Sequence, residues 1–250
     1  MALLKVLLLL LLGLGVTVNS DVSLQKRIIG GQNCPDTERL YHVRVESSNG
    51  THMKRCGGSL IHPEWILTAA HCWKLEPGWI TVAMLKVHPR TAGRQSQVIQ
   101  RPMMYNFQHD IFLLRLETPV TDVPLARLPD CSYRLKVGDV VQLAGEGATT
   151  VSHRKLRLIG AAIPAHLQCV DMRVDQVSQF HEAFGNLFHV KAPNKDVCYG
   201  DTGGAAMYND MIYGVISFVE ANSACQEPAM ILDVCEYLWW IKAALGFNKT

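Results

Sequence analysis

The sequence predicts an all-β protein, a barrel or a sandwich, that ends in a single helix. Short apolar runs recur between clusters of Gly, Pro, Asn and Asp, which is typical of antiparallel strands joined by turns. By contrast, Tyr237–Leu245 is apolar around most of its circumference, and this favours a terminal helix docked on the body. The runs expected to be strands are residues 41–45, 59–61, 80–83, 111–116, 140–143 and 212–218.

Composition narrows the class of protein. The 250 residues are 48% hydrophobic and 18% charged, which is enough for a substantial core and too apolar for a disordered chain. A formal net charge of +2 gives no electrostatic reason to expect nucleic acid or a membrane surface as a partner. Beyond residue 20, no apolar stretch reaches the roughly 18 residues that a membrane span needs, so we expect a soluble mature chain.

The N-terminus has the pattern of a secretory signal peptide. Lys5 precedes the apolar run Val6–Leu12, and small or polar residues follow up to Ser20. We therefore expect residues 1–20 to be removed and the protein to be secreted. A membrane anchor is the alternative interpretation, but the apolar run is short for one.

A candidate activation site follows the signal peptide. The short polar segment 21–27 ends in Lys26-Arg27, and Ile28-Ile29-Gly30-Gly31 comes next. A dibasic pair before two β-branched apolar residues suggests a propeptide, cleavage after Arg27 and a buried new N-terminus at Ile28. A surface turn before a strand is the alternative.

Eight cysteines follow the signal peptide, and an even number in a secreted chain predicts disulfides. Asn49-Gly50-Thr51 and Asn248-Lys249-Thr250 are glycosylation sequons. Asn49 is the stronger candidate, because the second sequon lies at the extreme C-terminus.

Three motifs carry chemistry. Thr68–Cys72 places His71 beside a cysteine, His109–Leu114 places Asp110 before an apolar run, and Cys198–Gly204 is a Gly-rich turn around a hydroxyl. Each motif is weak alone, but their order of histidine, aspartate and hydroxyl is specific. Together with Ile28-Ile29-Gly30-Gly31, they resemble the chymotrypsin/trypsin family of serine proteases, over residues 28 to about 245.

The resemblance implies a fold and three roles. It implies two packed antiparallel β-barrels, over about residues 28–133 and 134–235, followed by a helix over 236–246. His71 would be the general base and Asp110 the carboxylate that orients it. Thr202 stands where the family has its nucleophilic serine.

The Gly-rich turn has two further implied roles. The backbone N–H groups of Gly200 and Thr202 would form the oxyanion hole. Asp201 would pair with the amino group of Ile28 that cleavage after Arg27 sets free. The resemblance also implies four disulfides, which are Cys34–Cys169, Cys56–Cys72, Cys131–Cys235 and Cys198–Cys225.

Thr202 is the central departure from the family. Its β-branched side chain has a stiff χ1, so the extra methyl must find room in a crowded turn. A displacement of about 1 Å from the attack geometry can cost on the order of 100-fold in rate. Threonine nucleophiles exist, but the well-known kind uses its own N-terminal amine as base, and Thr202 is internal.

The implied specificity pocket also departs from the family. Asp196 occupies the position that binds Arg or Lys side chains, and Ser217 begins a pocket wall. Val219 and Ala229 replace usual glycines and would narrow the pocket, unless the backbone shifts to make room. Glu146 replaces a tryptophan that is typical near the site.

No cofactor is expected. The stretch 78–97 has no acidic residue, so a calcium loop is not supported, and His71-Cys72 is better explained by a disulfide than by zinc. Our leading hypothesis is a secreted, monomeric protease homologue with little or no activity that binds proteases, inhibitors or receptors. The alternative is an active endopeptidase that uses Thr202, with trypsin-like or altered specificity.

Overall fold

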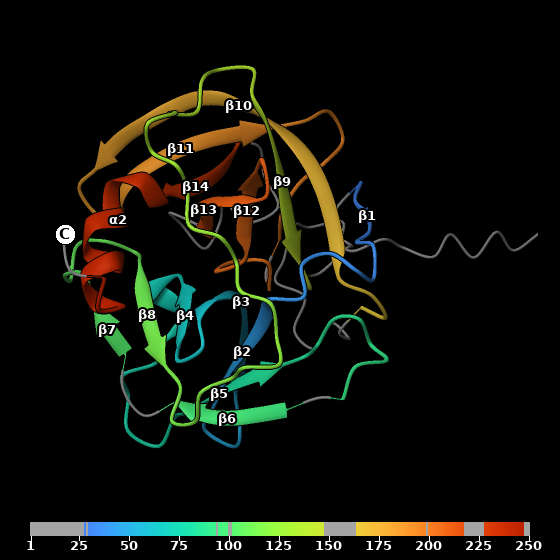
Figure 1. Ribbon diagram of the computed structural model, residues 1–250, viewed down its shortest axis with the longest axis vertical. Coiled ribbons are helices and arrows are strands. Elements are labelled where there is room, and N and C mark those ends of the chain that lie inside the picture. The colour runs from blue at the N-terminus through green and yellow to red at the C-terminus, as the bar shows by residue number, and fades with distance from the viewer. Residues whose placement is uncertain are drawn as a thin grey trace, which may run out of the picture.

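The computed structural model describes residues 28, 30–93, 95–99, 102–147, 164–198, 200–217 and 228–247. These residues form two seven-stranded antiparallel sheets and a C-terminal α-helix, which confirms the predicted fold class (Figure 1). None of the described helices is long and apolar enough to cross a membrane. The expected signal peptide and propeptide, residues 1–27, lie outside the described residues.

One sheet closes into a barrel. Its strand order is β10-β11-β14-β13-β12-β9, and β9 pairs back onto β10, so six strands complete the circle. The short strand β1 adds to one edge of β10, although the sequence placed its residues in the first barrel. The strands are β1 (Gln32–Asn33), β9 (Val140–Gly145), β10 (Gln168–His181), β11 (Gly185–Lys191), β12 (Ala205–Tyr208), β13 (Met211–Ser217) and β14 (Ala229–Asp233).

The other sheet curls into a half-barrel, which lies below the closed barrel in Figure 1. Its strand order is β6-β5-β2-β3-β4-β8-β7. A short 3-10 helix, η1 (Ala70–Cys72), follows β4 and carries the candidate histidine. The strands are β2 (His42–Ser48), β3 (Met53–His62), β4 (Trp65–Thr68), β5 (Ile80–Leu85), β6 (Gln95–Ile99), β7 (Pro102–Met104) and β8 (Phe112–Arg115).

The terminal helix α2 (Val234–Ala244) begins two residues before the predicted start. Asp233 caps its N-terminus, because the side chain accepts a hydrogen bond from the Cys235 N–H. One face, which includes Tyr237 and Ile241, is buried against the body, whereas Trp239 is 61% exposed. The helix therefore docks by one face, although its sequence is apolar on most sides.

Among the described residues, the structure forms three of the four predicted disulfides. Cys34–Cys169 ties the chain after β1 to β10, Cys56–Cys72 ties β3 to η1, and Cys131–Cys235 ties the connection between the sheets to α2. Cys225, which belongs to the fourth predicted pair, lies outside the described residues.

Gly214 provides a test of how tightly the closed barrel is packed. A Cβ added there would lie 2.2 Å from Ile231 Cγ2 and 3.0 Å from the Phe188 ring. We expect Gly214→Ala to lower the free energy of unfolding by about 1–3 kcal/mol, the usual range for an overpacked core. Urea denaturation would measure the loss. Gly93→Ala is the matched control, because an added Cβ there has no neighbour within 4 Å. Equal effects of the two variants would contradict the packing argument.

Candidate functional site

The pairing of β4 with β8 brings the candidate histidine and aspartate together. Thr68 at the end of β4 lies opposite Phe112 at the start of β8, so the residues just outside both strands are neighbours. Ala70 N–H donates to the Asp110 carbonyl, which anchors η1 to the chain before β8. His71 and Asp110, 39 residues apart in sequence, therefore meet at one end of the curled sheet.

Asp110 is a buried acceptor for donors from both sheets. Its carboxylate accepts the His71 backbone N–H at 2.8 Å and faces His71 Nδ1 at 2.8 Å. The hydroxyl of Ser217, at the end of β13, donates to the same carboxylate. Because an ionised carboxylate can only accept, Nδ1 carries the imidazole proton and Nε2 is left to accept another. A histidine held in this way can act as a general base.

The turn after Cys198 is crowded and needs glycine. Gly200 and Gly203 have φ of 97° and 82°, where a side chain is strained. A Cβ on Gly203 would also lie 2.3 Å from the Gly57 carbonyl oxygen. Across the two sheets, Gly57 N–H donates to the Thr202 carbonyl at 2.7 Å.

The amide groups of this turn can serve an anion. In the part of the chain that the structure describes, the N–H groups of Gly200 and Thr202 donate to no other group. Two free N–H groups beside a hydroxyl are what an oxyanion hole requires. Gly200 and Thr202 therefore remain the predicted oxyanion pair.

The hydroxyl of Thr202 faces a disulfide. Its Oγ1 lies 3.4 Å from Cys56 Sγ and 4.0 Å from Cys72 Sγ, and the residue is only 4% exposed. Among the described residues, Oγ1 makes no hydrogen bond with His71. Because a disulfide sulfur is at most a weak acceptor, this contact cannot remove the hydroxyl proton.

Asp201 is completely buried, and backbone amides hold its carboxylate. Gly147 N–H donates to Oδ1 and Cys198 N–H to Oδ2, both at 2.7 Å. Burial raises the pKa of Asp201 to about 7, against these two hydrogen bonds, and the charges of Asp196 and Glu146 add to the rise. Ile28, the expected partner after cleavage, packs in the core of the closed barrel. Arg27 lies outside the described residues.

The structure describes three of the four predicted pocket residues. Asp196, Ser217 and Ala229 are all buried, and Asp196 Oδ1 accepts the N–H of Val197 at 2.8 Å. Val219, which we expected at the pocket mouth, lies outside the described residues. The specificity pocket therefore stays a prediction, and the structure adds only that three of its four predicted residues are buried.

Cys56, His71 and Cys72 bring their potential metal-ligand atoms within 4.8 Å of one another. However, the two sulfurs are bonded to each other in a disulfide. A disulfide provides no thiolate, which is the form of cysteine that binds zinc. The chemistry of this cluster therefore does not fit a zinc site.

Sequence reasoning missed two features of this site. Ser217 was assigned only to the pocket wall, yet it donates to Asp110. Glu146 was noted only as a replacement, yet it is buried against Arg44 and Arg90. The signal in the sequence was an acidic residue between two glycines at the end of an apolar strand, together with Arg44 between two valines.

Comparisons with known proteins agree with this geometry. The sequence profile of the trypsin family matches residues 28–241. Trypsin-4 of Rattus norvegicus is 30% identical over 253 residues, which cover 94% of this chain and 96% of that protein. Kallikrein-2 of Homo sapiens is 30% identical over 251 residues, covering 90% and 92%.

Solved structures support the fold. A structure of GrC matches with a TM-score of 0.72 and 22% identity, covering 88% of this chain and 100% of that one. Neuropsin, a serine protease of mouse brain, matches with a TM-score of 0.68 and 22% identity, covering 86% and 98%. At this identity the likeness concerns the fold alone.

The raised pKa of Asp201 predicts a pH dependence of stability before cleavage. The folded state holds the Asp201 proton up to about pH 7, whereas an ordinary aspartate loses it near pH 3.8. The Asp201 contribution to the free energy of unfolding should therefore be full below about pH 4 and should fall as the pH rises towards 7.

Denaturation of wild type and Asp201→Asn between pH 4 and 8 would isolate this contribution as a difference. The difference is needed because the lowered pKa of buried His42, about 4, acts in the opposite direction. The exposed Asp36→Asn serves as control. Parallel pH profiles of wild type and Asp201→Asn would contradict the assignment.

Proposed function

The chain belongs to the trypsin family, and we propose that it is a secreted member with little or no proteolytic activity that acts by binding other proteins. One observation carries the proposal. The Thr202 hydroxyl faces the Cys56–Cys72 disulfide and makes no hydrogen bond with His71 among the described residues. The base and its orienting carboxylate are in place, but the hydroxyl that they would activate is not hydrogen-bonded to the base among the described residues.

This geometry predicts a large loss in the rate of peptide-bond cleavage. Attack needs the hydroxyl within hydrogen-bond reach of the base and aligned with the substrate carbonyl. The loss of a triad member leaves only about 10³–10⁴-fold catalysis over water, which is negligible for a protease. The remaining features, an amide-lined turn and a buried Asp196, would then serve to hold a protein or peptide segment rather than to cleave it.

The residue types expected in the pocket support a change of ligand. In the family, glycine usually follows the proline that corresponds to Pro228, whereas this chain has the buried Ala229. The added methyl lies on the predicted path of a long basic side chain to Asp196. We therefore expect the ligands to be proteases, inhibitors or receptors whose docking segment does not insert a full arginine.

An active endopeptidase is the second candidate, and a specific observation favours it. The His71–Asp110–Ser217 hydrogen bonds are complete, although a pure binding protein has no need of them. This candidate requires the Thr202 hydroxyl to form a hydrogen bond with His71 Nε2 once a substrate is bound. In that case the chain would cleave slowly after a basic or small residue.

Labelling with a fluorophosphonate separates the two candidates. The purified protein is cut after Arg27 and then exposed to the probe, which reacts only with activated hydroxyls. We expect no labelling of wild type, and labelling of Thr202→Ser that is faster by at least about 100-fold, because serine lacks the methyl that restricts χ1. Wild-type labelling that disappears in His71→Ala would establish the active candidate instead.

Secretion and glycosylation make a separate prediction. Asn49 is exposed in the turn between β2 and β3, and its Oδ1 accepts the N–H groups of Thr51 and His52. Expressed in eukaryotic cells, the full chain should reach the medium with Asp21 as its first residue. Treatment with an N-glycosidase should lower its mass, and Asn49→Gln should abolish this shift while Asn248→Gln preserves it. Retention of residues 1–20 in the membrane fraction would favour the anchor.

A further inference from the structure

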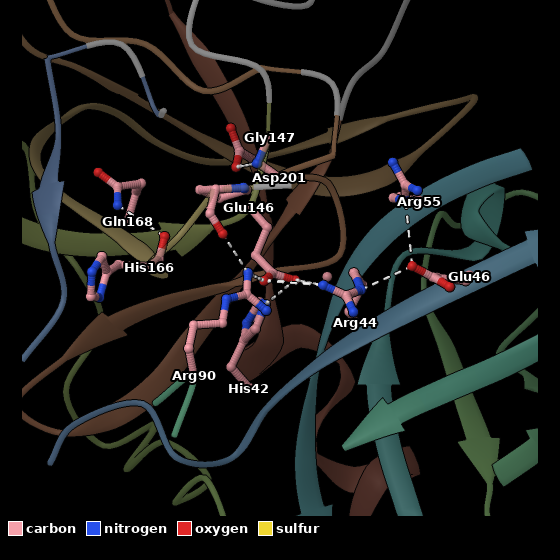
Figure 2. A network of polar contacts seen from close by, with 12 residues as sticks. His42, Arg44, Glu46, Arg55, Arg90, Glu146, Gly147, His166, Gln168 and Asp201 are labelled. Atoms are coloured by element: carbon pink, nitrogen blue, oxygen red, sulfur yellow. Dashed lines mark hydrogen bonds and ion pairs between the residues drawn. The ribbon is translucent and has the colours of Figure 1, made fainter. Parts of the chain in front are cut away.

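A buried carboxylate joins the two sheets beside the Asp201 turn (Figure 2). Glu146 follows β9 of the closed barrel, and cationic side chains of the curled sheet surround it. Arg44 Nη1 lies 3.4 Å from Glu146 Oε2, and Arg90 Nη2 is hydrogen-bonded to Oε1. His42 Nε2 lies 3.9 Å from Oε2. We call these four residues the Glu146 cluster.

Burial makes these ion pairs costly to break. The side chains of Glu146 and Arg44 are 5% and 4% exposed, and that of Arg90 is 16% exposed. Burial lowers the pKa of His42 to about 4, so this histidine is neutral at pH 7. The two guanidinium groups therefore compensate the charge of Glu146. Removal of one partner from such a cluster leaves an uncompensated buried charge, so each partner holds the others in position.

The cluster is attached directly to the candidate site. The residue after Glu146 is Gly147, whose N–H donates to Asp201 Oδ1 at 2.7 Å. The Gly147 backbone is packed against this carboxyl, because an added Cβ would lie 2.5 Å from Asp201 Cγ. Asp201 in turn precedes Thr202. Three covalent or hydrogen-bonded steps thus connect the cluster to the Thr202 amide.

Arg90 strengthens this attachment. Besides Glu146, its guanidinium donates to the carbonyl groups of Pro164 at 2.8 Å and Ala165 at 3.2 Å. One side chain of the curled sheet therefore holds two segments of the closed barrel, before residue 148 and after residue 163. Its partial exposure makes it the end of the cluster that can be altered with the least damage.

We propose that Glu146 is a positioning residue: its buried ion pairs with Arg44 and Arg90 hold the Gly147 N–H against the Asp201 carboxylate and so keep the Asp201–Thr202 turn formed in the uncleaved chain. In the scheme that the resemblance implies, the Ile28 ammonium restrains this turn only after cleavage. Here the cluster supplies a restraint beforehand. The role holds whether or not Thr202 attacks a substrate.

Hydrogen exchange at the Gly147 amide tests the proposal in the uncleaved protein. We expect Glu146→Gln to accelerate hydrogen exchange of the Gly147 amide by at least about tenfold. In this variant, the turn can open locally without breaking the ion pairs of the Glu146 cluster. The backbone amides of Val141 and Leu143 in β9 should keep their wild-type rates. A uniform acceleration of all three amides would mean that Glu146 only stabilises the barrel, and an unchanged Gly147 rate would overturn the proposal.

Glu46→Gln is the matched control. Glu46 is also paired with Arg44, at 3.0 Å, and with Arg55, but it does not adjoin the turn. Its loss removes the same charge and should leave the Gly147 rate within about threefold of wild type. Arg90→Gln should reproduce the selective acceleration even if Glu146→Gln fails to fold.

A second readout uses Thr202→Ser, which carries a reactive reporter in the turn. In this background, Glu146→Gln should slow fluorophosphonate labelling of the uncleaved chain by at least about tenfold. Labelling of the cleaved chain should slow much less, because the Ile28 ammonium then restrains Asp201. Equal slowing of both forms, or a reporter that reacts only after cleavage, would contradict the proposal. Where the reporter is silent in both forms, the Gly147 exchange rate decides.

Discussion

The buried carboxylate of Asp110 is the point on which the site depends. It accepts two hydrogen bonds from His71, which belongs to the curled sheet, and one from Ser217, which belongs to the closed barrel. A buried carboxylate without these donors would be strongly destabilising, so folding must bring both sheets to it. The position of the imidazole, its tautomer and the contact between the sheets all follow from satisfying this one group.

Thr202 is the position at which the predicted triad departs from the family. Its carbonyl is fixed by Gly57 N–H, and the glycines on both sides allow the turn its unusual backbone. Only the side-chain torsion then remains free. With the methyl of threonine in this crowded turn, the hydroxyl lies against the Cys56–Cys72 disulfide. The surrounding residues match those of the trypsin family, and the environment of this one hydroxyl is the basis of the proposed loss of activity.

The buried carboxyl groups of Asp201 and Glu146 have different kinds of partner. Among the described residues, Asp201 accepts hydrogen bonds from two backbone N–H groups, and burial raises its pKa to about 7 despite them. Glu146, one residue from the amide that serves Asp201, has two arginine partners. Asp201 can therefore accept the Ile28 ammonium as a new partner after cleavage, whereas Glu146 is already paired with two arginines. Because of this contrast, the Glu146 cluster can restrain the Asp201–Thr202 turn before the Ile28 ammonium is set free by cleavage.

Sequence by itself determined much of this protein. The order of His71, Asp110 and Thr202, the Gly-rich turn and the alternation of short apolar runs predicted the fold class and the family. The resemblance to that family then implied four disulfides, of which the described residues form three. These signals are local, since each depends on residue types within a few positions of one another. Tertiary structure decided the rest, namely the start of α2 at the Asp233 cap, the donation of Ser217 to Asp110, the burial of Glu146 between two arginines and the direction of the Thr202 hydroxyl. The Asp233 cap is a local contact with Cys235. The other features depend on side chains that are about 55 to 150 residues apart in the chain, and only packing of the two sheets brings such groups within hydrogen-bond distance.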